Sequence, residues 1–575
     1  MGSKRISFEG KLHILAAVVL AVSAVMIWMG YGQDIEFHAE RLAAIAAEIK
    51  NGPGVYRIYT TVCDGYGYAS PMFYGDLFLY PAALLAAAGL PLGIAFRLFL
   101  ASVMVCAYLS MYCCVKALWG RETAVLAAYL YAFSPILLAD IFIRFAVGEA
   151  LAFIFIPIVL FGFYRIVIEP VHPKTDWIFL ALGMSGLIFS HIISTVLTVI
   201  LLIFLCILNV KRIFKDKMSI LRMVYAALLT VAITAYFTLP MLEQMATSEF
   251  YVINRQTSNL AGNVAPFVGL IFGSEYMSVI NVIVEKLTGT ADYFSFSWFP
   301  GAFGYILFFV LFIRWKKKEL LRDKKADSFL LLGILYLVIS TVPFIQPLLE
   351  PFVGFIKIPW RNLTFYMLFL SLSAALMLKK IKEDHQANVY RAGLLIPAFG
   401  TLVAFLGLVM ITLHNGMFPF EQLSTTSIGL GEYLPSAVSS YDYSLERGEM
   451  VVCSDPEVSY EFRRCSGYAE LSYMGAKGEI SFEVPVYMYL GYDVADEVTG
   501  VSYEPSVSEN GLVEFSITDS AAPDSGAGTV KIYYKGTLLQ KISVWISLIT
   551  VICLAAILVY CSHYKNQSRL NGDKE

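Results

Sequence analysis

Three side chains suited to acid–base and phosphate chemistry follow the first hydrophobic segment of the chain. Asp34, His38 and Arg41 are spaced i, i+4 and i+7, which places a carboxylate, an imidazole and a guanidinium on one face of a helix. A carboxylate beside a bilayer can serve as general base for a hydroxyl group, because partial burial raises its basicity. We expect Asp34 and His38 to be catalytic and Arg41 to bind a phosphate. The alternative is an amphipathic helix on the membrane surface, with Arg41 against lipid headgroups.

A second set of charges stands where one apolar segment ends and the next begins. It consists of Asp140, Arg144 and Glu149. Charges at membrane depth are costly unless they are paired or used, so such a set is a functional hypothesis. Arginine suits phosphate because its planar fork donates two parallel hydrogen bonds. We expect Arg144 to bind phosphate and Glu149 or Asp140 to act in catalysis. A structural ion pair between neighbouring helices is the alternative.

Three further residues are candidates for substrate or phosphate binding. Trp360 and Arg361 fall at an expected membrane interface, where the same residue types are also ordinary anchors. His191 follows Ser190 between two apolar segments, where the alternative is a structural histidine at a helix end. The chain has no CxxC, HExxH or P-loop motif, which argues against a zinc site, a zinc protease and an ATPase. We expect no cofactor and no nucleic-acid partner, and the sequence does not indicate a divalent metal.

The elements that must position these residues are membrane-spanning helices. The chain has 575 residues, 58% of them hydrophobic, and a mean hydropathy of +0.66. Apolar runs of about 17 to 25 residues alternate with basic loops, which is typical of a polytopic helical membrane protein. With the basic loops cytoplasmic, both termini are cytoplasmic and twelve spans are expected. These spans are 12–30, 94–117, 121–138, 149–168, 177–190, 192–210, 220–240, 299–314, 328–344, 361–378, 392–413 and 542–562.

The first 413 residues form the expected transmembrane domain, and its outward loops carry the candidate residues. External loops are expected at 31–93, 139–148, 241–298 and 345–360. The apolar stretch 72–90 is predicted to dip into the outer leaflet without crossing, since a crossing would place the later basic loops outside.

The composition changes after residue 413. Polar and apolar residues alternate in stretches such as 479–484 and 529–534, separated by Gly, Pro, Asn and Asp. We expect a β-rich extracytoplasmic domain over 414–541, followed by a last transmembrane helix and a cytoplasmic tail over 542–575. Cys453 and Cys465 flank a turn-rich part of this domain, and we predict that they form a disulfide.

Several short motifs carry a family resemblance. They include the Asp-x-x-x-His loop at Asp34, Phe73-Tyr74, Ser134-Pro135, Gly148-Glu149 and 358–361, and the segments 429–435 and 485–492. The chain resembles the GT-C superfamily of integral-membrane glycosyltransferases. More specifically, it resembles the bacterial YfhO-like group and proteins described as 6-pyruvoyl-tetrahydropterin synthase-related membrane proteins. No histidine cluster suited to the zinc of a soluble pterin synthase is present, so the pterin chemistry is set aside.

The resemblance implies sugar transfer at the outer face of a bacterial cytoplasmic membrane. In the GT-C superfamily a carboxylate of the first external loop is catalytic, which corresponds to Asp34 here, and a second acidic position corresponds to Asp140 or Glu149. Tyr74 joins the substrate-binding candidates. The donor would be a polyprenyl-phosphate-linked sugar, and the acceptor a cell-envelope glycan, glycolipid or protein. The alternative is a non-enzymatic transporter or assembly factor for lipid-linked envelope glycans.

Overall fold

The computed structural model describes most of the chain. The described residues are 30–170, 175–251, 260–265, 310–312, 314–315, 323–391, 393, 395, 417–420, 423, 431–438, 448–496, 499–518 and 526–572. They belong to two compact units, each built from segments far apart in the sequence. The first unit comprises 1–39, 90–219 and 256–423, and the second comprises 40–89, 220–255 and 424–575.

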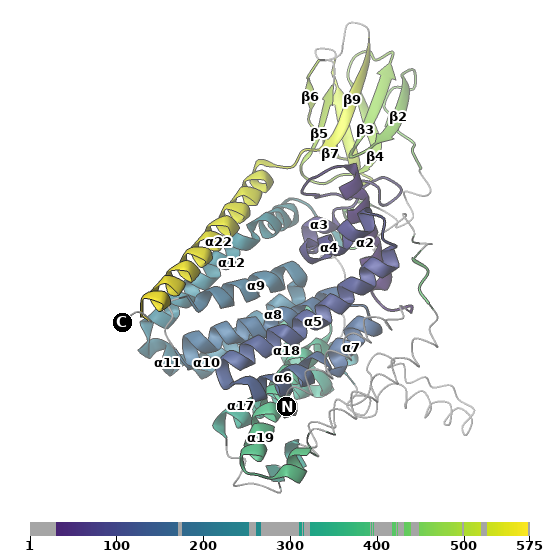
Figure 1. The fold of residues 1–575 in the computed structure, drawn as a ribbon. Coiled ribbons are helices and arrows are strands. Elements are labelled where there is room, and N and C mark those ends of the chain that lie inside the picture. Colours follow the sequence, from purple (N-terminus) through teal and green to yellow (C-terminus); the bar gives the residue numbers. More distant parts are fainter. Residues whose placement is uncertain are drawn as a thin grey trace, which may run out of the picture. The chain divides into compact units, whose positions relative to one another are not determined.

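The first unit is helical in its described part (Figure 1). Its elements are α5 (Leu92–Trp119), α6 (Arg121–Ala132), α7 (Pro135–Phe142), α8 (Val147–Phe163) with the π-helical turn η2 (Tyr164–Ile168), α9 (Trp177–Ser190), α10 (Ile192–Leu208), α11 (Val210–Lys215), η3 (Leu260–Asn263), α17 (Lys324–Thr341), η4 (Pro343–Ile345), α18 (Gln346–Val353), η5 (Gly354–Ile356), η6 (Pro359–Asn362) and α19 (Leu363–Glu383). Two long helices, α2 (Ile35–Asn51) and α12 (Lys217–Thr247), contribute residues to both units.

Helices α8 and α9 pack closely because glycines line their contact. A Cβ atom on Gly162 would lie 2.4 Å from the backbone nitrogen of Leu180, and one on Gly183 would lie 2.8 Å from that of Val159. Small residues of this kind let two membrane helices approach at backbone distance, where van der Waals contact replaces the hydrophobic effect. These contacts lie in the second half of α8, the helix that carries Glu149 in its first turn.

Helix α19 forms the interior of the first unit and packs against α6 and α17. Nearly all of its residues from Leu363 to Leu378 are buried, and so is every residue of α6 from Thr123 to Ala132. A helix that is apolar around its circumference belongs inside a bundle rather than at its surface. The start of α19 and η6 before it therefore hold Arg361 in a fixed place.

Five described helices are long and apolar enough to cross a membrane, and two bent pairs raise this number to seven if each pair is one span. The five are Leu92–Trp119, Val147–Ile168, Lys217–Thr247, Pro359–Glu383 and Leu538–Tyr560. The sequence prediction of an integral membrane protein is thereby supported. Twelve spans and the orientation of the termini stay predictions, because segments such as 12–30, 299–309 and 396–413 lie outside the described residues. The expected spans at 177–190 and 192–210 are helices of only 14 and 17 residues.

The second unit combines short helices with a β-rich part and a long C-terminal helix. Its described elements are α3 (Ser70–Phe73), η1 (Leu77–Leu79), α4 (Tyr80–Ala87), β1 (Val452–Cys453), β2 (Ser459–Cys465), β3 (Tyr468–Met474), β4 (Ile480–Tyr487), β5 (Tyr492–Asp496), β6 (Ser502–Tyr503), β7 (Ser506–Val507), β8 (Leu512–Ile517), β9 (Ala527–Tyr534) and α22 (Leu538–Gly572). Helices α12 and α22 lie side by side, where Ser547 Oγ accepts a hydrogen bond from the backbone N–H of Tyr236 at 2.9 Å. The region 72–90 holds only short helices, and its dip into the outer leaflet stays a prediction.

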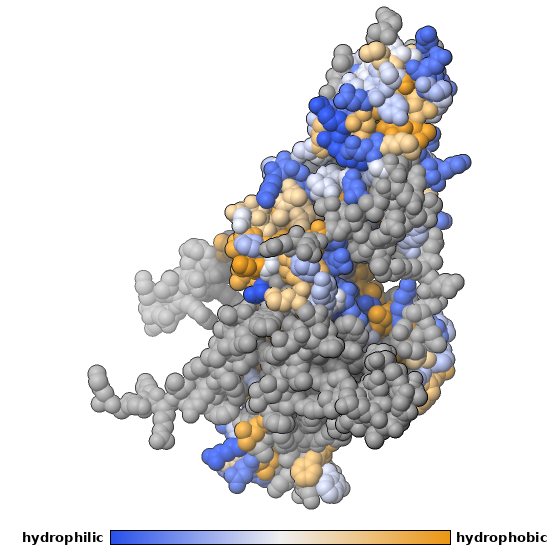
Figure 2. All heavy atoms as spheres, turned by 90° about the vertical axis from the view of Figure 1, so that its right-hand side faces the viewer, coloured by the Kyte–Doolittle hydropathy of each residue, from blue (hydrophilic) through white to orange (hydrophobic). Residues whose placement is uncertain are grey.

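The strands form two antiparallel sheets, ordered β1-β4-β8-β7 and β2-β3-β9-β5-β6. The alternation in the sequence correctly predicted β4 and β9, since Phe482 and Val484 of β4 are fully buried, and so are Val530 and Ile532 of β9. Side chains from both sheets share one hydrophobic core, and the outer surface of this part carries many hydrophilic residues (Figure 2). The β-rich region is confirmed, whereas its extracytoplasmic location stays a prediction.

The predicted disulfide is wrong for this structure. Cys453 and Cys465 are both free thiols. Cys453 belongs to β1 and is opposite Phe482, whereas Cys465 ends β2 and is opposite Tyr468. The two residues therefore belong to different sheets. The chain passes from one sheet to the other within the twelve positions that separate the two cysteines, so short sequence separation did not bring the sulfurs together.

Candidate functional site

The connection between α7 and α8 positions the central charged group. Pro135 starts α7, and the helix ends where the backbone N–H of Arg144 donates to the carbonyl of Ala139 at 2.8 Å. Phe145 then adopts a φ of +56°, a left-handed conformation that costs a non-glycine residue about 1–3 kcal/mol. This turn directs the side chain of Arg144 back toward both flanking helices.

Arg144 is buried, with 2% of its surface exposed, and its guanidinium is occupied on every side. It donates to Glu149 through two bonds, Nη1 to Oε2 at 3.0 Å and Nη2 to Oε1 at 3.1 Å. Nη1 also bonds to Asp140, and Nε donates to Gln33 Oε1 at 2.9 Å. The ring of Trp360 covers the guanidinium, with its centroid 4.2 Å from Cζ, a distance typical of a cation–π contact.

Glu149 joins Arg144 to a second arginine from a distant part of the chain. Its Oε1 also accepts a hydrogen bond from Arg361 Nε at 2.9 Å. Arg361 Nη1 donates to the carbonyl of Ile356 at 3.3 Å, and 16% of the Arg361 side chain remains exposed. The side chain of Arg361 is therefore more exposed than that of Arg144, of which 3% is exposed.

The group combines two arginines with two buried carboxylates, so its charges balance. Removing one member of such a network leaves an uncompensated buried charge, which costs about 3–5 kcal/mol. One acceptor is left over, because Oδ2 of the fully buried Asp140 has no hydrogen-bond partner among the described residues. The structure brings together five residues that the sequence offered as candidates, and their catalytic and binding roles stay predictions; they are Asp140, Arg144, Glu149, Trp360 and Arg361.

Asp34 meets this group through its backbone. Its N–H donates to the carbonyl of Arg144 at 2.9 Å, and its carboxylate acts electrostatically on both Arg144 and Asp140. The contact depends on Gly32, because a Cβ atom there would lie 2.3 Å from the carbonyl oxygen of Ile143. Asp34 is a partly buried residue beside this buried charge network.

His191 caps the helix that follows it. Its Nδ1 accepts from the backbone N–H of Ser194 at 3.3 Å and lies 2.8 Å from the Ser194 hydroxyl. This is the helix-end role that the sequence offered as the alternative to substrate binding. The imidazole also interacts electrostatically with Glu149 and Arg361, so the cap stands beside the charged group.

The expected grouping of Asp34, His38 and Arg41 on one helical face is not found. Helix α2 begins at Ile35, so Asp34 precedes it. His38 and Arg41 are 1% and 0% exposed, which excludes the surface helix in contact with headgroups that was the alternative. The physical reason is that α2 buries residues around much of its circumference rather than along one stripe.

Arg41 belongs to a separate buried cluster in the second unit. Its guanidinium bonds to Asp76, donates to the carbonyl of Gly75 at 2.9 Å, and lies 4.3 Å from the ring centroid of Tyr74. The hydroxyl of Tyr59 also donates to Asp76. Burial alone would lower the pKa of Arg41, but Asp76, Tyr59 and Tyr74 together outweigh burial and raise that pKa. Arg41 and Tyr74 therefore form a structural pair here rather than an open phosphate site.

Two partners in these clusters were not anticipated, namely Gln33 and Asp76. Gln33 stands directly before Asp34, and its amide had no distinguishing spacing. Asp76 was visible as a carboxylate within an apolar stretch, which is a signal for a buried charge pair. Among the described residues, no group of three His, Cys, Asp or Glu side chains is arranged to hold a metal ion.

Comparison with sequences of known proteins adds little about function. No family model matches the chain, so neither the YfhO-like group nor the pterin-synthase-related group is supported. An uncharacterized protein of Lactococcus lactis subsp. cremoris (strain MG1363) is 23% identical over 277 residues. The match covers 46% of this chain and 45% of that relative, so it spans less than half of either protein.

Comparison with solved structures finds similarity to an arabinofuranosyltransferase and to an oligosaccharyltransferase. The chain is similar to the mycobacterial arabinofuranosyltransferase AftD, with 15% identity, a TM-score of 0.42, and 69% of this chain but 27% of that one covered. It is also similar to the oligosaccharyltransferase AglB of Archaeoglobus fulgidus, solved with an inhibitory peptide and a dolichol-phosphate. For AglB the identity is 13%, the TM-score 0.37, and the shares are 74% and 57%. TM-scores below 0.5 carry no argument about activity.

Proposed function

We propose that this protein is a membrane glycosyltransferase that moves a sugar from a polyprenyl-phosphate-linked donor to a cell-envelope acceptor at the outer face of a bacterial cytoplasmic membrane. The observation that carries the proposal is the position of Asp34 beside the Arg144–Glu149–Arg361 network. It places the carboxylate-bearing Asp34, a partly buried residue, against the network that holds the guanidinium of Arg361, whose side chain is 16% exposed. These are the two groups that transfer from a sugar phosphate requires.

The reaction assigns a role to each group. The acceptor hydroxyl oxygen forms a bond to the anomeric carbon while the bond from that carbon to the phosphate oxygen breaks. Asp34 takes the hydroxyl proton, and the departing phosphate keeps the electron pair and is stabilised by Arg361. His38, expected from the sequence to assist, is buried in α2 and holds no assigned contact with the substrate.

Arg144 takes a different role from the one that its type indicated. Its guanidinium is already bonded to Asp140, Glu149 and Gln33, so a phosphate would have to displace a carboxylate. We infer that Arg144 is a positioning residue, which holds Glu149 and through it Arg361. Asp140 and Glu149 then serve to balance charge rather than to move protons.

Replacement of Asp34 by Asn tests the proposal. The change removes the proton acceptor and keeps the shape, so transfer from a polyprenyl-phosphate sugar in purified membranes should fall by about 10²-fold or more. The melting temperature should not change. The matched control is Glu36→Gln, at an exposed carboxylate in the first turn of α2. Wild-type transfer by Asp34→Asn would exclude Asp34 as base and make Asp140 or Glu149 the next candidate. If no change at these three positions altered any glycan assay, the transporter or assembly-factor hypothesis would replace this one.

A further inference from the structure

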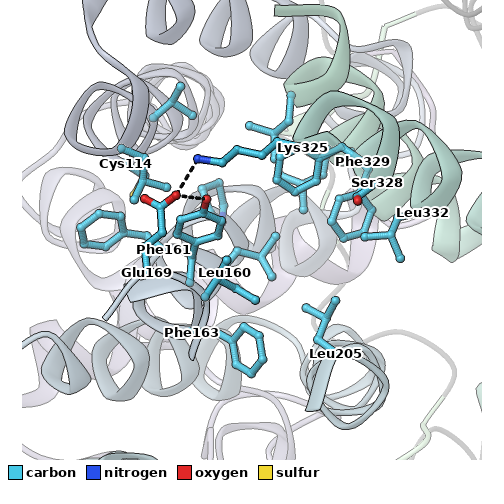
Figure 3. A pocket seen from close by; sticks show the side chains of 18 of the residues that line it. Cys114, Leu160, Phe161, Phe163, Glu169, Leu205, Lys325, Ser328, Phe329 and Leu332 are labelled. Atoms are coloured by element: carbon cyan, nitrogen blue, oxygen red, sulfur yellow. Dashed lines mark hydrogen bonds and ion pairs between the residues drawn. The ribbon is translucent and has the colours of Figure 1, made fainter. Parts of the chain in front are cut away.

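The first unit contains a cavity far from the charged group described above. Its volume is about 700 Å³, and it is lined by residues at the ends of α5, α8 with η2, and α10, together with the start of α17 and part of α19. A volume of this size lies within the range of ordinary ligand sites. Figure 3 shows its lining of aliphatic and aromatic side chains, including Leu160, Phe163, Leu205 and Leu332.

One rim of the cavity is cationic. Arg212, Lys324 and Lys325 line it, with Glu169 as the carboxylate among the lining residues. Glu169 is engaged by Lys325, whose Nζ lies 2.5 Å from Oε1, and by the hydroxyl of Tyr164 at 3.0 Å (Figure 3). The hydrogen bond from Lys325 lowers the pKa of Glu169, so this pair stays ionised and neutralises itself. Arg212 and Lys324 have no carboxylate partner among the described residues and leave the rim with an excess of positive charge.

A buried hydrogen-bond donor among the lining residues of the cavity is a second indication of a ligand with a polar group. Trp119 lines the cavity, and its indole Nε1 is buried without a hydrogen-bond partner among the described residues. The ring is fixed by edge contacts with Tyr164 and Phe329, each at 5.6 Å between centroids. A buried donor that lacks an acceptor is costly, and an acceptor oxygen of a bound molecule would remove that cost.

We propose that this cavity binds a membrane lipid with an anionic headgroup, whose hydrocarbon chain lies among the apolar side chains and whose headgroup contacts Arg212 and Lys324. The apolar wall and the unbalanced cations belong to the same cavity, which is the combination that an amphiphilic anion requires. Basic pockets between membrane helices are suited to such headgroups.

This site is distinct from the proposed sugar-transfer site. Glu149 stands in the first turn of α8, whereas Phe163 and Tyr164, at its other end, line the cavity. Phe163 is 14 positions after Glu149, which corresponds to about 21 Å along the helix at 1.5 Å per residue, and none of Asp34, Asp140, Arg144, Glu149 and Arg361 lines the cavity. The basic loops at the cavity end are the ones expected in the cytoplasm, so the lipid would come from the cytoplasmic leaflet.

Native mass spectrometry of the full chain in detergent tests the proposal with two probes, dioleoyl phosphatidylglycerol and dioleoyl phosphatidylcholine. The wild-type protein should bind one phosphatidylglycerol more tightly than any phosphatidylcholine. Replacing Arg212 and Lys324 by Gln should weaken that affinity by about fivefold for each cation removed. The matched control replaces Lys211 and Lys215 by Gln, because both are exposed cations of the same region that do not line the cavity.

The chain-binding part is tested separately by filling the cavity. Leu205→Trp should weaken binding of phosphatidylglycerol by about tenfold or more, whereas Ile203→Trp, on the outward side of α10 with 55% exposure, should not. Melting temperatures within a few degrees of wild type show that each variant is folded. Equal affinity for the two lipids, equal effects of the rim and control substitutions, or full binding by Leu205→Trp would each overturn the proposal. The last result would mean that lipid binds around the protein and not in the cavity.

Discussion

Glu149 Oε1 accepts a hydrogen bond from Arg361 Nε at 2.9 Å, although 212 positions separate the two residues. The same carboxylate holds Arg144 through two bonds. One side chain thus holds two guanidiniums, one from the connection between α7 and α8 and one from η6. Both the folding of the first unit and the proposed phosphate contact therefore depend on Glu149.

Replacing Glu149 by Gln should destabilise the protein by about 3–5 kcal/mol, because the buried charge of Arg144 and the partly buried charge of Arg361 would then have only Asp140 to balance them. The measurement is thermal unfolding of the purified full chain in detergent. Glu122→Gln is the matched control, since Glu122 forms an exposed pair with Lys382 at 2.8 Å. Exposed pairs contribute at most about 1 kcal/mol, so a similar loss in both variants would contradict the network's role.

Exchanging each arginine for Lys should separate a ligand contact from a positioning role. Arg361→Lys keeps the charge beside Glu149 but loses the planar fork, and should lower kcat/KM for the lipid-linked donor by about 10- to 100-fold, mainly through KM. Arg144→Lys loses the bond to Gln33 and should chiefly lower the melting temperature. If Arg144→Lys raised the donor KM without changing the melting temperature, Arg144 would be the phosphate ligand that the sequence first indicated.

The sequence predicted local features of this molecule better than distant ones. Alternation with period two correctly indicated β4 and β9, because burial in a strand follows directly from side-chain direction. A pairing of Arg144 with Glu149 was one of the two interpretations that the sequence allowed, because the two residues are only five positions apart. Their contact with Arg361 was not predictable, since it depends on how α19 packs in the bundle.

The grouping of Asp34 with His38 and Arg41 shows why spacing alone failed. Asp34 stands at the start of α2, where its carbonyl accepts a hydrogen bond from the backbone N–H of His38 at 3.1 Å, but His38 and Arg41 are both buried inside the fold. The partner of Arg41 is Asp76, 35 positions away. Such a pair is set by tertiary packing and leaves no periodic pattern in the sequence.

Gly32→Ala should disturb the contact between the segment that precedes α2 and the turn that follows α7, where Asp34 bonds to Arg144. The added Cβ would lie 2.3 Å from the Ile143 carbonyl oxygen and 2.5 Å from Cδ2 of Phe145, so one of the two segments must move. We expect a loss of about 1–3 kcal/mol in stability and a parallel loss of transfer. Gly54→Ala is the control, because its nearest atom, on Tyr56, is 3.5 Å away. Unchanged stability and transfer in Gly32→Ala would show that the close approach is not required.

The last prediction concerns the acid stability of the β-rich part and rests on Asp493. Burial alone would raise the pKa of Asp493, but hydrogen bonds from Lys535 at 2.7 Å, Ser502 at 2.6 Å and Tyr533 at 3.0 Å outweigh it and lower that pKa. An unfolded Asp has a pKa of about 3.9. Asp493 therefore stabilises the folded state above that pH, and the contribution is lost as the pH falls below it toward the lower folded pKa.

Asp493→Asn should remove this dependence. The variant should show weaker hydrogen-exchange protection of β5 and β9 at pH 6, and a smaller further loss between about pH 4 and pH 2.5 than the wild-type chain. The measurement is hydrogen exchange of the full chain, corrected for the intrinsic pH dependence of amide exchange. Glu509→Gln is the control, because Glu509 is exposed and should leave the profile unchanged. If Asp493→Asn and wild type lost protection in parallel below pH 4, the hydrogen bonds to Asp493 would not be the source of acid sensitivity.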